Sequence, residues 1–152
     1  MTVEAGDRAP KFTLLDETGA PVSLSDFAGR SLAVYFYPKA FTPGCTTQAC
    51  DLRDTHQRFI AAGYAVVGIS PDPVDKLSKF REEYELPFSV LSDPDHKVAA
   101  AYGAWGMKKN YGKEYEGIIR STFLIDGKGV ITTAWRNVKA AGHADRLLRE
   151  IG

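Results

Sequence analysis

Apolar residues along the chain fall into short dense runs that alternate with segments of helical spacing. Residues 31–38 (SLAVYFYP) and 64–70 (YAVVGIS) are almost wholly apolar, which predicts two buried central strands. Residues 42–63 between them predict a helix, and residues 72–86 repeat apolar positions every three or four residues, as an amphipathic helix does. This alternation indicates an α/β protein with neighbouring strands in one sheet.

The flanking segments extend the same pattern. Residues 11–27 predict two short strands around a turn at Thr18-Gly19, with Ser25 as the cap of a helical turn. Weak periodicity over residues 104–117 predicts a long loop or a ragged hairpin. The remaining expected elements are a strand at 88–93, a helix at 93–103, a hairpin of strands 118–126 and 129–137 around Asp126-Gly127-Lys128-Gly129, and a helix at 142–152.

These elements predict the fold class. We expect a mixed central β-sheet with helices on both faces and an N-terminal β-hairpin. The chain has 152 residues and no repeat, low-complexity stretch or linker, so we expect residues 1–152 to form a single domain.

Composition and charge argue against some classes of binding partner. Nineteen basic and nineteen acidic side chains give a formal net charge of zero, which argues against a nucleic-acid partner. The pair Lys108-Lys109 is expected to be a solvated part of the 104–117 loop. The first twelve residues lack the pattern of a signal peptide, and no apolar run is long enough to span a membrane, so a cytoplasmic protein without membrane contact is expected.

The only two cysteines, Cys45 and Cys50, lie five residues apart. Structural disulfides are rare in the cytosol, so these residues are either inert buried thiols or reactive groups. A zinc site is not expected, because two cysteines with four residues between them lack the usual ligand spacing. His56 is about three helical turns from Cys45 and is too distant to be its base; His56, His96 and His143 are expected to be structural.

The start of the helix at 42–63 favours a reactive cysteine. Thr42 suits the N-cap, Pro43 the first helical position and Gly63 the residue just past the end. Cys45 then lies in the first turn, where free backbone N–H groups and the helix dipole favour a thiolate. Gly44 beside it leaves room for a small molecule to approach.

The two cysteines are expected to lie in different surroundings. Cys45 shares its helical face with the apolar residues that follow it, whereas Cys50 lies toward the polar side. Five residues of ideal helix separate their Cα atoms by roughly 8–9 Å, and a disulfide needs roughly 4.4–6.8 Å. A Cys45–Cys50 disulfide would therefore require the helix to unwind locally.

The segment FYPKAFTPGCTTQACDLRD resembles the active-site segment of the peroxiredoxins, of the bacterioferritin-comigratory-protein (PrxQ) type. The pattern P-x3-T-x2-C is present as Pro38, Thr42 and Cys45, and similar stretches occur over most of the chain, including VVGISPD at 66–72, VLSDPDHKVAAAYG at 90–103 and RSTFLID at 120–126. The resemblance implies a thioredoxin-like fold and thiol peroxidase activity.

The resemblance also implies a role for each matching residue. Cys45 matches the peroxidatic cysteine and Cys50 the resolving cysteine of one branch of the subfamily. Thr42 and Arg120 match the residues that hold the peroxide and the thiolate, and Pro38 matches a residue that shields the pocket. Ionisation of a thiol alone accelerates attack too little for an enzyme, so donors aimed at the peroxide oxygens are needed as well.

We therefore expect a peroxidase that reduces hydrogen peroxide and alkyl hydroperoxides through a Cys45 sulfenic acid. Cys50 would resolve this acid as an intramolecular disulfide, and thioredoxin or a similar dithiol would recycle it. No cofactor and no metal are expected, and a monomer or weak homodimer is the default. The alternatives are a thioredoxin-like disulfide oxidoreductase or redox sensor, and a non-enzymatic binding module with inert cysteines.

Overall fold

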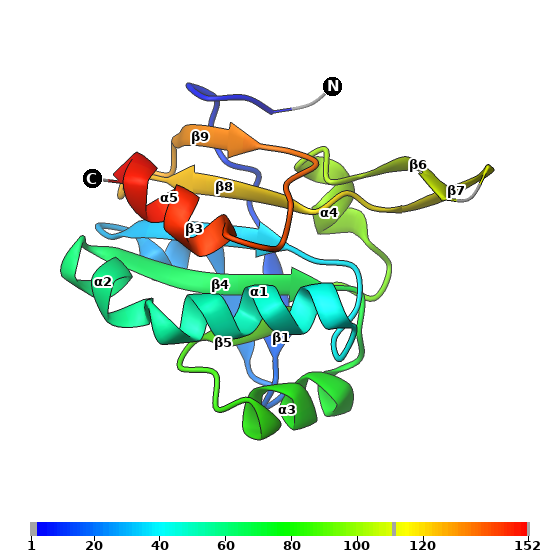
Figure 1. Cartoon of the computed structure of the whole chain (residues 1–152). Coiled ribbons are helices and arrows are strands. Elements are labelled where there is room, and N and C mark those ends of the chain that lie inside the picture. The colour runs from blue at the N-terminus through cyan, green and yellow to red at the C-terminus, as the bar shows by residue number, and fades with distance from the viewer. Residues whose placement is uncertain (1–2, 111, 152) are drawn as a thin grey trace.

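The computed structural model describes residues 3–110 and 112–151, and their centre is a seven-stranded sheet. Its strands run in the order β2-β1-β5-β4-β3-β8-β9, and a separate two-stranded sheet pairs β6 with β7. The helices α1, α2 and α5 lie on one face and α4 on the other, and α3 lies near β5 and packs into the same core as α1 (Figure 1). The expected mixed sheet with helices on both faces is confirmed.

Most helices and strands lie within their expected ranges, but the helix expected at 93–103 covers only Lys97–Ala101. The strands are β1 Thr13–Asp16, β2 Pro21–Ser23, β3 Ser31–Phe36, β4 Tyr64–Ser70, β5 Ser89–Ser92, β6 Trp105–Asn110, β7 Lys113–Ile118, β8 Ser121–Ile125 and β9 Ile131–Trp135. The helices are the 3-10 turn η1 Leu24–Phe27 and the α-helices α1 Pro43–Asp54, α2 His56–Ala61, α3 Val74–Glu83, α4 Lys97–Ala101 and α5 His143–Ile151.

The apolar runs form the middle of the sheet. β3 pairs in parallel with β4, with Val34 opposite Val67, and β4 pairs in parallel with β5. β8 lies antiparallel on the other side of β3, with Phe36 opposite Ser121. Buried side chains alternate along β3 between two cores, since Tyr35 faces the core under α1 and α5 and Phe36 faces the core under α4.

Three expectations need correction. The helix at 42–63 is interrupted at Thr55, whose hydroxyl donates a hydrogen bond to the Asp51 carbonyl at 2.7 Å and whose backbone leaves helical geometry. The turn η1 is capped by Ser23 and not by Ser25, because the Ser23 N–H donates to the Asp26 carboxylate at 2.9 Å. The strand expected from residue 118 begins only at Ser121.

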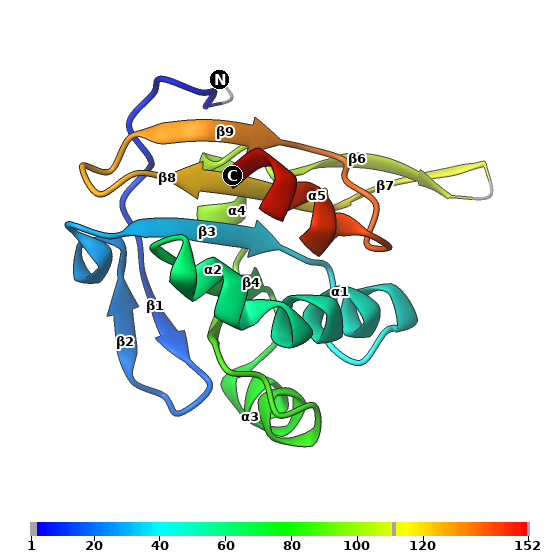
Figure 2. The same cartoon turned by 60° about the vertical axis from the view of Figure 1, so that its left-hand side comes forward.

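Residues 104–117, expected to form a long loop or a ragged hairpin, form a regular hairpin. β6 and β7 pair in unbroken register from Trp105 opposite Ile118 to Asn110 opposite Lys113. The hairpin projects from the body on the side where α1 begins (Figures 1 and 2). The sequence shows no clear strand pattern here, because the glycines and charged residues of this segment leave few apolar positions that could alternate with polar ones.

Candidate active site

Cys45 lies in the first turn of α1 and is buried, with 1% of its surface exposed. Thr42 is the N-cap in extended geometry and Pro43 opens the helix, which places the sulfur at the end where backbone N–H groups are free. The side chain packs with Ala49 and Leu52 on the inner face of the helix. Both cysteines are free thiols in this structure.

Arg120 supplies a cation directly to this sulfur. It lies between β7 and β8, and the pairing of β8 with β3 brings it next to the loop that leads into α1. Its Nη2 donates a hydrogen bond to Cys45 Sγ at 3.3 Å, across 75 residues of sequence. A Cβ on Gly44 would lie 3.3 Å from the same nitrogen, so glycine leaves Arg120 its place above the helix start.

Gln48 is a site residue that the sequence interpretation missed. Its side chain is completely buried, and its Oε1 accepts a hydrogen bond from Nη1 of Arg120. The guanidinium therefore bonds Cys45 and Gln48 with its two terminal nitrogens, which fixes its orientation. The signal was present in the sequence, since Gln48 is the one strongly polar residue on the buried stripe of α1, one turn after Cys45.

Thr42 and Pro38 lie on the loop that approaches the site. The Thr42 hydroxyl donates to the Lys39 carbonyl at 2.7 Å, so its proton is directed to the loop, and the side chain makes no capping hydrogen bond to α1. Pro38 is half-buried and follows β3 by two residues. The structure thus gathers Pro38, Thr42, Cys45 and Arg120 around one end of the sheet, and Arg120 makes the direct contact with the sulfur.

A buried carboxylate anchors this loop. Asp72 accepts hydrogen bonds from the Ala40 N–H at 2.7 Å and from the Ser70 hydroxyl at 2.9 Å, and its other oxygen pairs with Lys76 at 3.2 Å. Phe41, which follows Ala40 in the loop, has a positive φ of 69°, which is unfavourable for an aromatic residue. The Asp72 contacts hold the chain in this geometry just before α1 starts.

Cys50 is half-buried on α1, whereas Cys45 is fully buried. Because α1 is continuous from Pro43 to Asp54, ideal helix geometry places the two Cα atoms roughly 8–9 Å apart, beyond the roughly 4.4–6.8 Å of a disulfide. The reduced helix therefore separates the thiols, and a disulfide between them requires the first turns of α1 to open.

The three histidines have structural surroundings. The His143 ring is buried at the start of α5 and shares a 2.7 Å hydrogen bond between its Nε2 and the Thr122 hydroxyl. Burial, together with the nearby cations Arg146 and Arg120, lowers the pKa of His143 to about 4. His56 packs against Phe88, and His96 stacks on Trp105 with ring centroids 3.6 Å apart.

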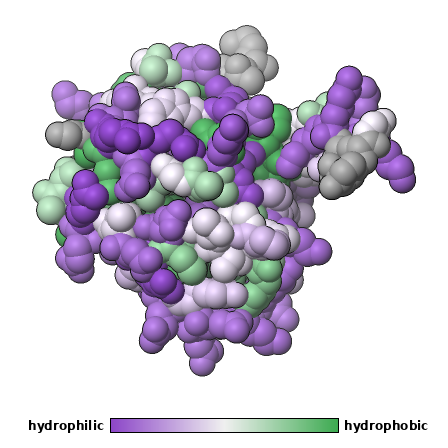
Figure 3. All heavy atoms as spheres, viewed as in Figure 1, coloured by the Kyte–Doolittle hydropathy of each residue, from purple (hydrophilic) through white to green (hydrophobic). Residues whose placement is uncertain are grey.

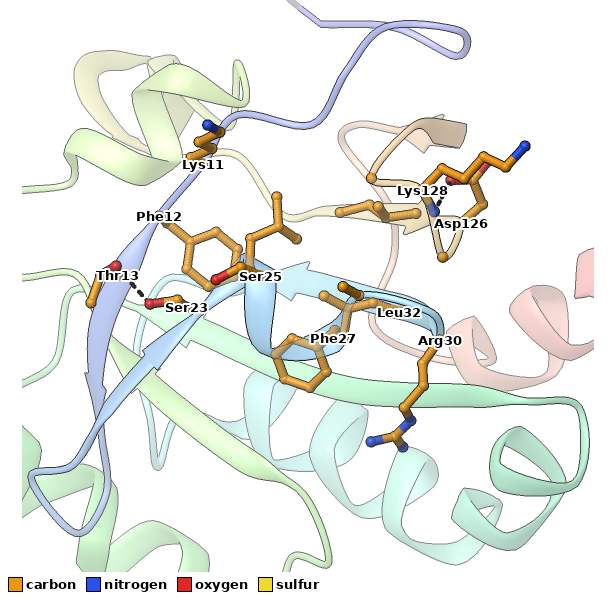
Figure 4. Close-up of a pocket in the computed structure, with 15 residues that line it drawn as sticks. Lys11, Phe12, Thr13, Ser23, Ser25, Phe27, Arg30, Leu32, Asp126 and Lys128 are labelled. Atoms are coloured by element: carbon orange, nitrogen blue, oxygen red, sulfur yellow. Dashed lines mark hydrogen bonds between the residues drawn. The ribbon is translucent and has the colours of Figure 1, made fainter.

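A cavity of about 360 Å³ lies far from Cys45, beside the start of β3 (Figure 4). Phe12, Phe27 and Leu32 form its apolar wall, whereas Lys11, Arg30 and Lys128 point outward. Asp126 also lines the cavity, and its carboxylate accepts hydrogen bonds from the Lys128 and Val130 N–H groups. Because Cys45 follows the opposite end of β3, the cavity has no part in thiol chemistry at Cys45.

Among the described residues, no group of three or more His, Cys, Asp or Glu side chains is arranged to hold a metal ion. In the same part of the chain, no helix is both long and apolar enough to cross a membrane.

Comparisons with known proteins agree with this geometry. Residues 5–134 match the model of the AhpC/TSA family. Peroxiredoxin Bcp of Bacillus subtilis is 48% identical over 151 residues, covering 99% of this chain and 96% of the relative. Peroxiredoxin Bcp of Escherichia coli is 50% identical over 146 residues, covering 96% and 94%.

Solved structures show the same similarity. Peroxiredoxin Q of Xanthomonas campestris superposes with a TM-score of 0.87 at 38% identity, over 92% of this chain and 89% of the other. Peroxidoxin BcpB of Mycobacterium tuberculosis superposes with a TM-score of 0.86 at 35% identity, over 98% and 96%. The expected thioredoxin-like fold is confirmed by these neighbours.

Proposed function

Because the chain belongs to the peroxiredoxins of the AhpC/TSA family, we propose that it is a thiol peroxidase whose peroxidatic residue is Cys45. The observation that carries this proposal is the 3.3 Å contact between Arg120 Nη2 and Cys45 Sγ at the start of α1. A cation and free backbone N–H groups at one buried sulfur favour the nucleophilic thiolate.

In the first step, the Cys45 thiolate attacks the terminal oxygen of the hydroperoxide. An S–O bond forms and the O–O bond breaks, so that Cys45 becomes a sulfenic acid and the peroxide leaves as an alcohol or water after taking up a proton. Negative charge develops on the leaving oxygen, and Arg120 is placed to stabilise it because its guanidinium is already oriented by Gln48. Thr42 and Pro38 complete the wall of the site from the preceding loop.

In the second step, Cys50 attacks the sulfenic sulfur and water leaves, which gives a Cys45–Cys50 disulfide. The separation in the reduced helix requires the start of α1 to unwind first. Thioredoxin or another dithiol then reduces the disulfide in two exchange steps. The proposed substrates are hydrogen peroxide and alkyl hydroperoxides, the proposed compartment is the cytoplasm, and the proposed assembly is a monomer or weak homodimer.

The proposal is tested by peroxide consumption with thioredoxin and its reductase. Wild type should turn over, Cys45→Ser should not react, and Cys50→Ser should consume about one equivalent and then recycle poorly. Slow oxidation by peroxide combined with rapid exchange with protein disulfides would instead support the disulfide oxidoreductase or redox sensor. Full activity of Cys45→Ser would show that the proposal is wrong.

A further inference from the structure

The cavity beside the start of β3 has the composition of a small-molecule site. Its volume of about 360 Å³ falls within the roughly 300–1,000 Å³ of clefts that bind small ligands. Phe12 and Leu32 are buried in its wall, and Phe27 is half-buried beside them (Figure 4). On the face seen in Figure 3, by contrast, hydrophilic side chains separate the apolar ones among the described residues into small patches. The cavity therefore offers a ligand more enclosed apolar surface than that face does.

The lining favours a ligand with an apolar body, and an aromatic one in particular. Among the aromatic ring pairs of residues 3–110 and 112–151, none includes Phe12 or Phe27, so an aromatic ligand would supply ring contacts that these side chains lack. The hydroxyls of Thr13 and Ser23, which also line the cavity, are bonded to each other at 2.7 Å. This pairing leaves a single hydroxyl proton of the two for a ligand, so a ring suits the wall better than a sugar does.

Backbone hydrogen bonds join the segments that surround the cavity. The Leu24 N–H at the start of η1 donates to the Phe12 carbonyl at 3.2 Å, which ties η1 to the chain before β1. The Gly29 N–H donates to the Gly127 carbonyl at 2.9 Å, which ties the start of β3 to the turn between β8 and β9. A Cβ on Gly127 would lie 3.0 Å from the carbonyl carbon of Gly29, so glycine permits this close backbone packing. The cavity is thus formed before a ligand arrives, and binding requires little ordering of its walls.

Cations outnumber carboxylates around the rim of the cavity. Lys11, Arg30 and Lys128 point outward from it, and among the described residues none of the three has a carboxylate within 4.0 Å (Figure 4). Asp126 is the only acidic residue among the described ones that line the cavity, and its carboxylate already accepts the N–H groups of Lys128 and Val130. Three positive charges against one negative charge favour an anionic group at the rim.

We propose that this cavity is a binding site for a small aromatic carboxylate, whose ring lies against Phe12 and Phe27 and whose carboxylate lies among the cations of the rim. The site is independent of the proposed peroxidase function, because Cys45 follows the opposite end of β3. A ligand with one ring should bind with a dissociation constant of about 1 mM, as expected for a molecule of this size. The apolar wall and the cationic rim act on different parts of the ligand, so each can be tested separately.

The test is an NMR titration of the isotope-labelled reduced protein with cinnamate, an aromatic carboxylate, and with its uncharged amide. Backbone amide signals of residues 23–30 and 125–129 should shift and saturate below about 10 mM cinnamate, whereas those of residues 43–50 should not move. The double variant Lys11→Met, Lys128→Met should bind cinnamate about three- to tenfold more weakly and should bind the amide as wild type does. Added salt should weaken the binding of cinnamate alone.

Two further variants complete the test. Lys79→Met is the matched control, since Lys79 is an exposed lysine on α3 that does not line the cavity, and it should leave both affinities unchanged. Ser25→Trp adds a large ring at an exposed position of the cavity lining and should weaken both ligands at least about tenfold. The proposal would be overturned by the absence of saturable shifts around the cavity, by equal binding of cinnamate to wild type and the double lysine variant, or by unchanged binding in Ser25→Trp.

Discussion

At the scale of single residues, the two bonds of one guanidinium organise the site. Arg120 donates to Cys45 and to Gln48, so it supplies charge at the sulfur and is itself held in place. A lysine at this position would present its donors from a single nitrogen and lacks the rigid fork that holds two acceptors in fixed positions. The contribution of Arg120 is therefore its geometry as much as its charge.

Arg120→Lys should lower the second-order rate constant for hydrogen peroxide by about 100-fold, because one preoriented donor at the developing charge is lost. Stopped-flow oxidation of the reduced variant measures this constant. Arg149→Lys, on the exposed side of α5, is the matched control and should react like wild type. A less than twofold effect of Arg120→Lys would remove Arg120 from the mechanism.

Gln48→Met keeps the volume of the buried side chain and removes the acceptor for Arg120. The guanidinium then loses its orientation, so we expect a roughly tenfold lower rate constant, since one hydrogen bond to a charged group contributes about 1.5 kcal/mol. Gln48→Glu restores an acceptor and should hold Arg120 again, although its charge opposes the thiolate. Equal rates for Gln48→Met and wild type would leave Gln48 with a packing role only.

At the scale of elements, the start of α1 must adopt two conformations, one in the reduced protein and one in the proposed oxidised protein. In the reduced protein it holds Cys45 beneath Arg120, and in the proposed oxidised protein it must open to bring Cys50 close. The loop before it is anchored by Asp72 to β4, so unwinding is expected to be confined to the helix side of Thr42.

Hydrogen exchange should detect this opening. Backbone amides of residues 46–50 should exchange at least about tenfold faster after one equivalent of peroxide, because their helical hydrogen bonds are broken, whereas amides of β3 and β4 should not change. Cys50→Ser should remain protected after the same treatment, since no disulfide forms. Equal protection of residues 46–50 in reduced and oxidised wild type would contradict the unwinding step.

The sequence predicted the α/β pattern and the central strands. Long apolar runs such as those of β3 and β4 must be buried on both faces, which places them in the middle of the sheet. It placed Cys45 in the first turn of α1 because Thr42 and Pro43 are local signals. It missed the break at Thr55, which depends on one hydroxyl hydrogen bond. It also missed the regularity of the β6–β7 hairpin, whose glycines and charged residues give few apolar positions to alternate. The resemblance predicted a role for Arg120. Its hydrogen bond to Gln48 could not be predicted, because the two residues are 72 positions apart and are brought together by the pairing of β8 with β3.

At the scale of the whole molecule, buried polar groups make stability depend on pH. His143 is fully buried against Thr122, and its pKa is lowered to about 4, from an ordinary value of 6.5. The unfolded chain therefore takes up a proton at a higher pH than the folded protein does. The contribution of neutral His143 is complete above about pH 6.5 and is lost progressively between about pH 6.5 and pH 4.

His143→Gln should reduce this pH dependence. Glutamine can still bond the Thr122 hydroxyl but does not titrate, so the fall in unfolding free energy from pH 7 to pH 4.5 should be smaller in the variant, by on the order of 2 kcal/mol. Urea unfolding at a series of pH values measures the difference between wild type and variant. Parallel curves would mean that His143 does not titrate as its burial indicates.

That residues 1–152 act as one domain stays a prediction, but the intramolecular nature of the proposed disulfide can be tested in the whole molecule. Cys45 and Cys50 belong to the same segment between Lys39 and Arg53, so a single tryptic peptide carries both thiols. Any disulfide confined to this peptide must have formed within one chain.

The most direct test is a peptide map of the reduced protein after one equivalent of hydrogen peroxide, with free thiols alkylated before digestion. The peptide of residues 40–53 should be lighter than its reduced form by two hydrogen atoms and should carry no alkyl group. A peptide alkylated at both cysteines, a stable oxygen adduct on Cys45 alone, or a disulfide joining two chains would contradict the proposed mechanism.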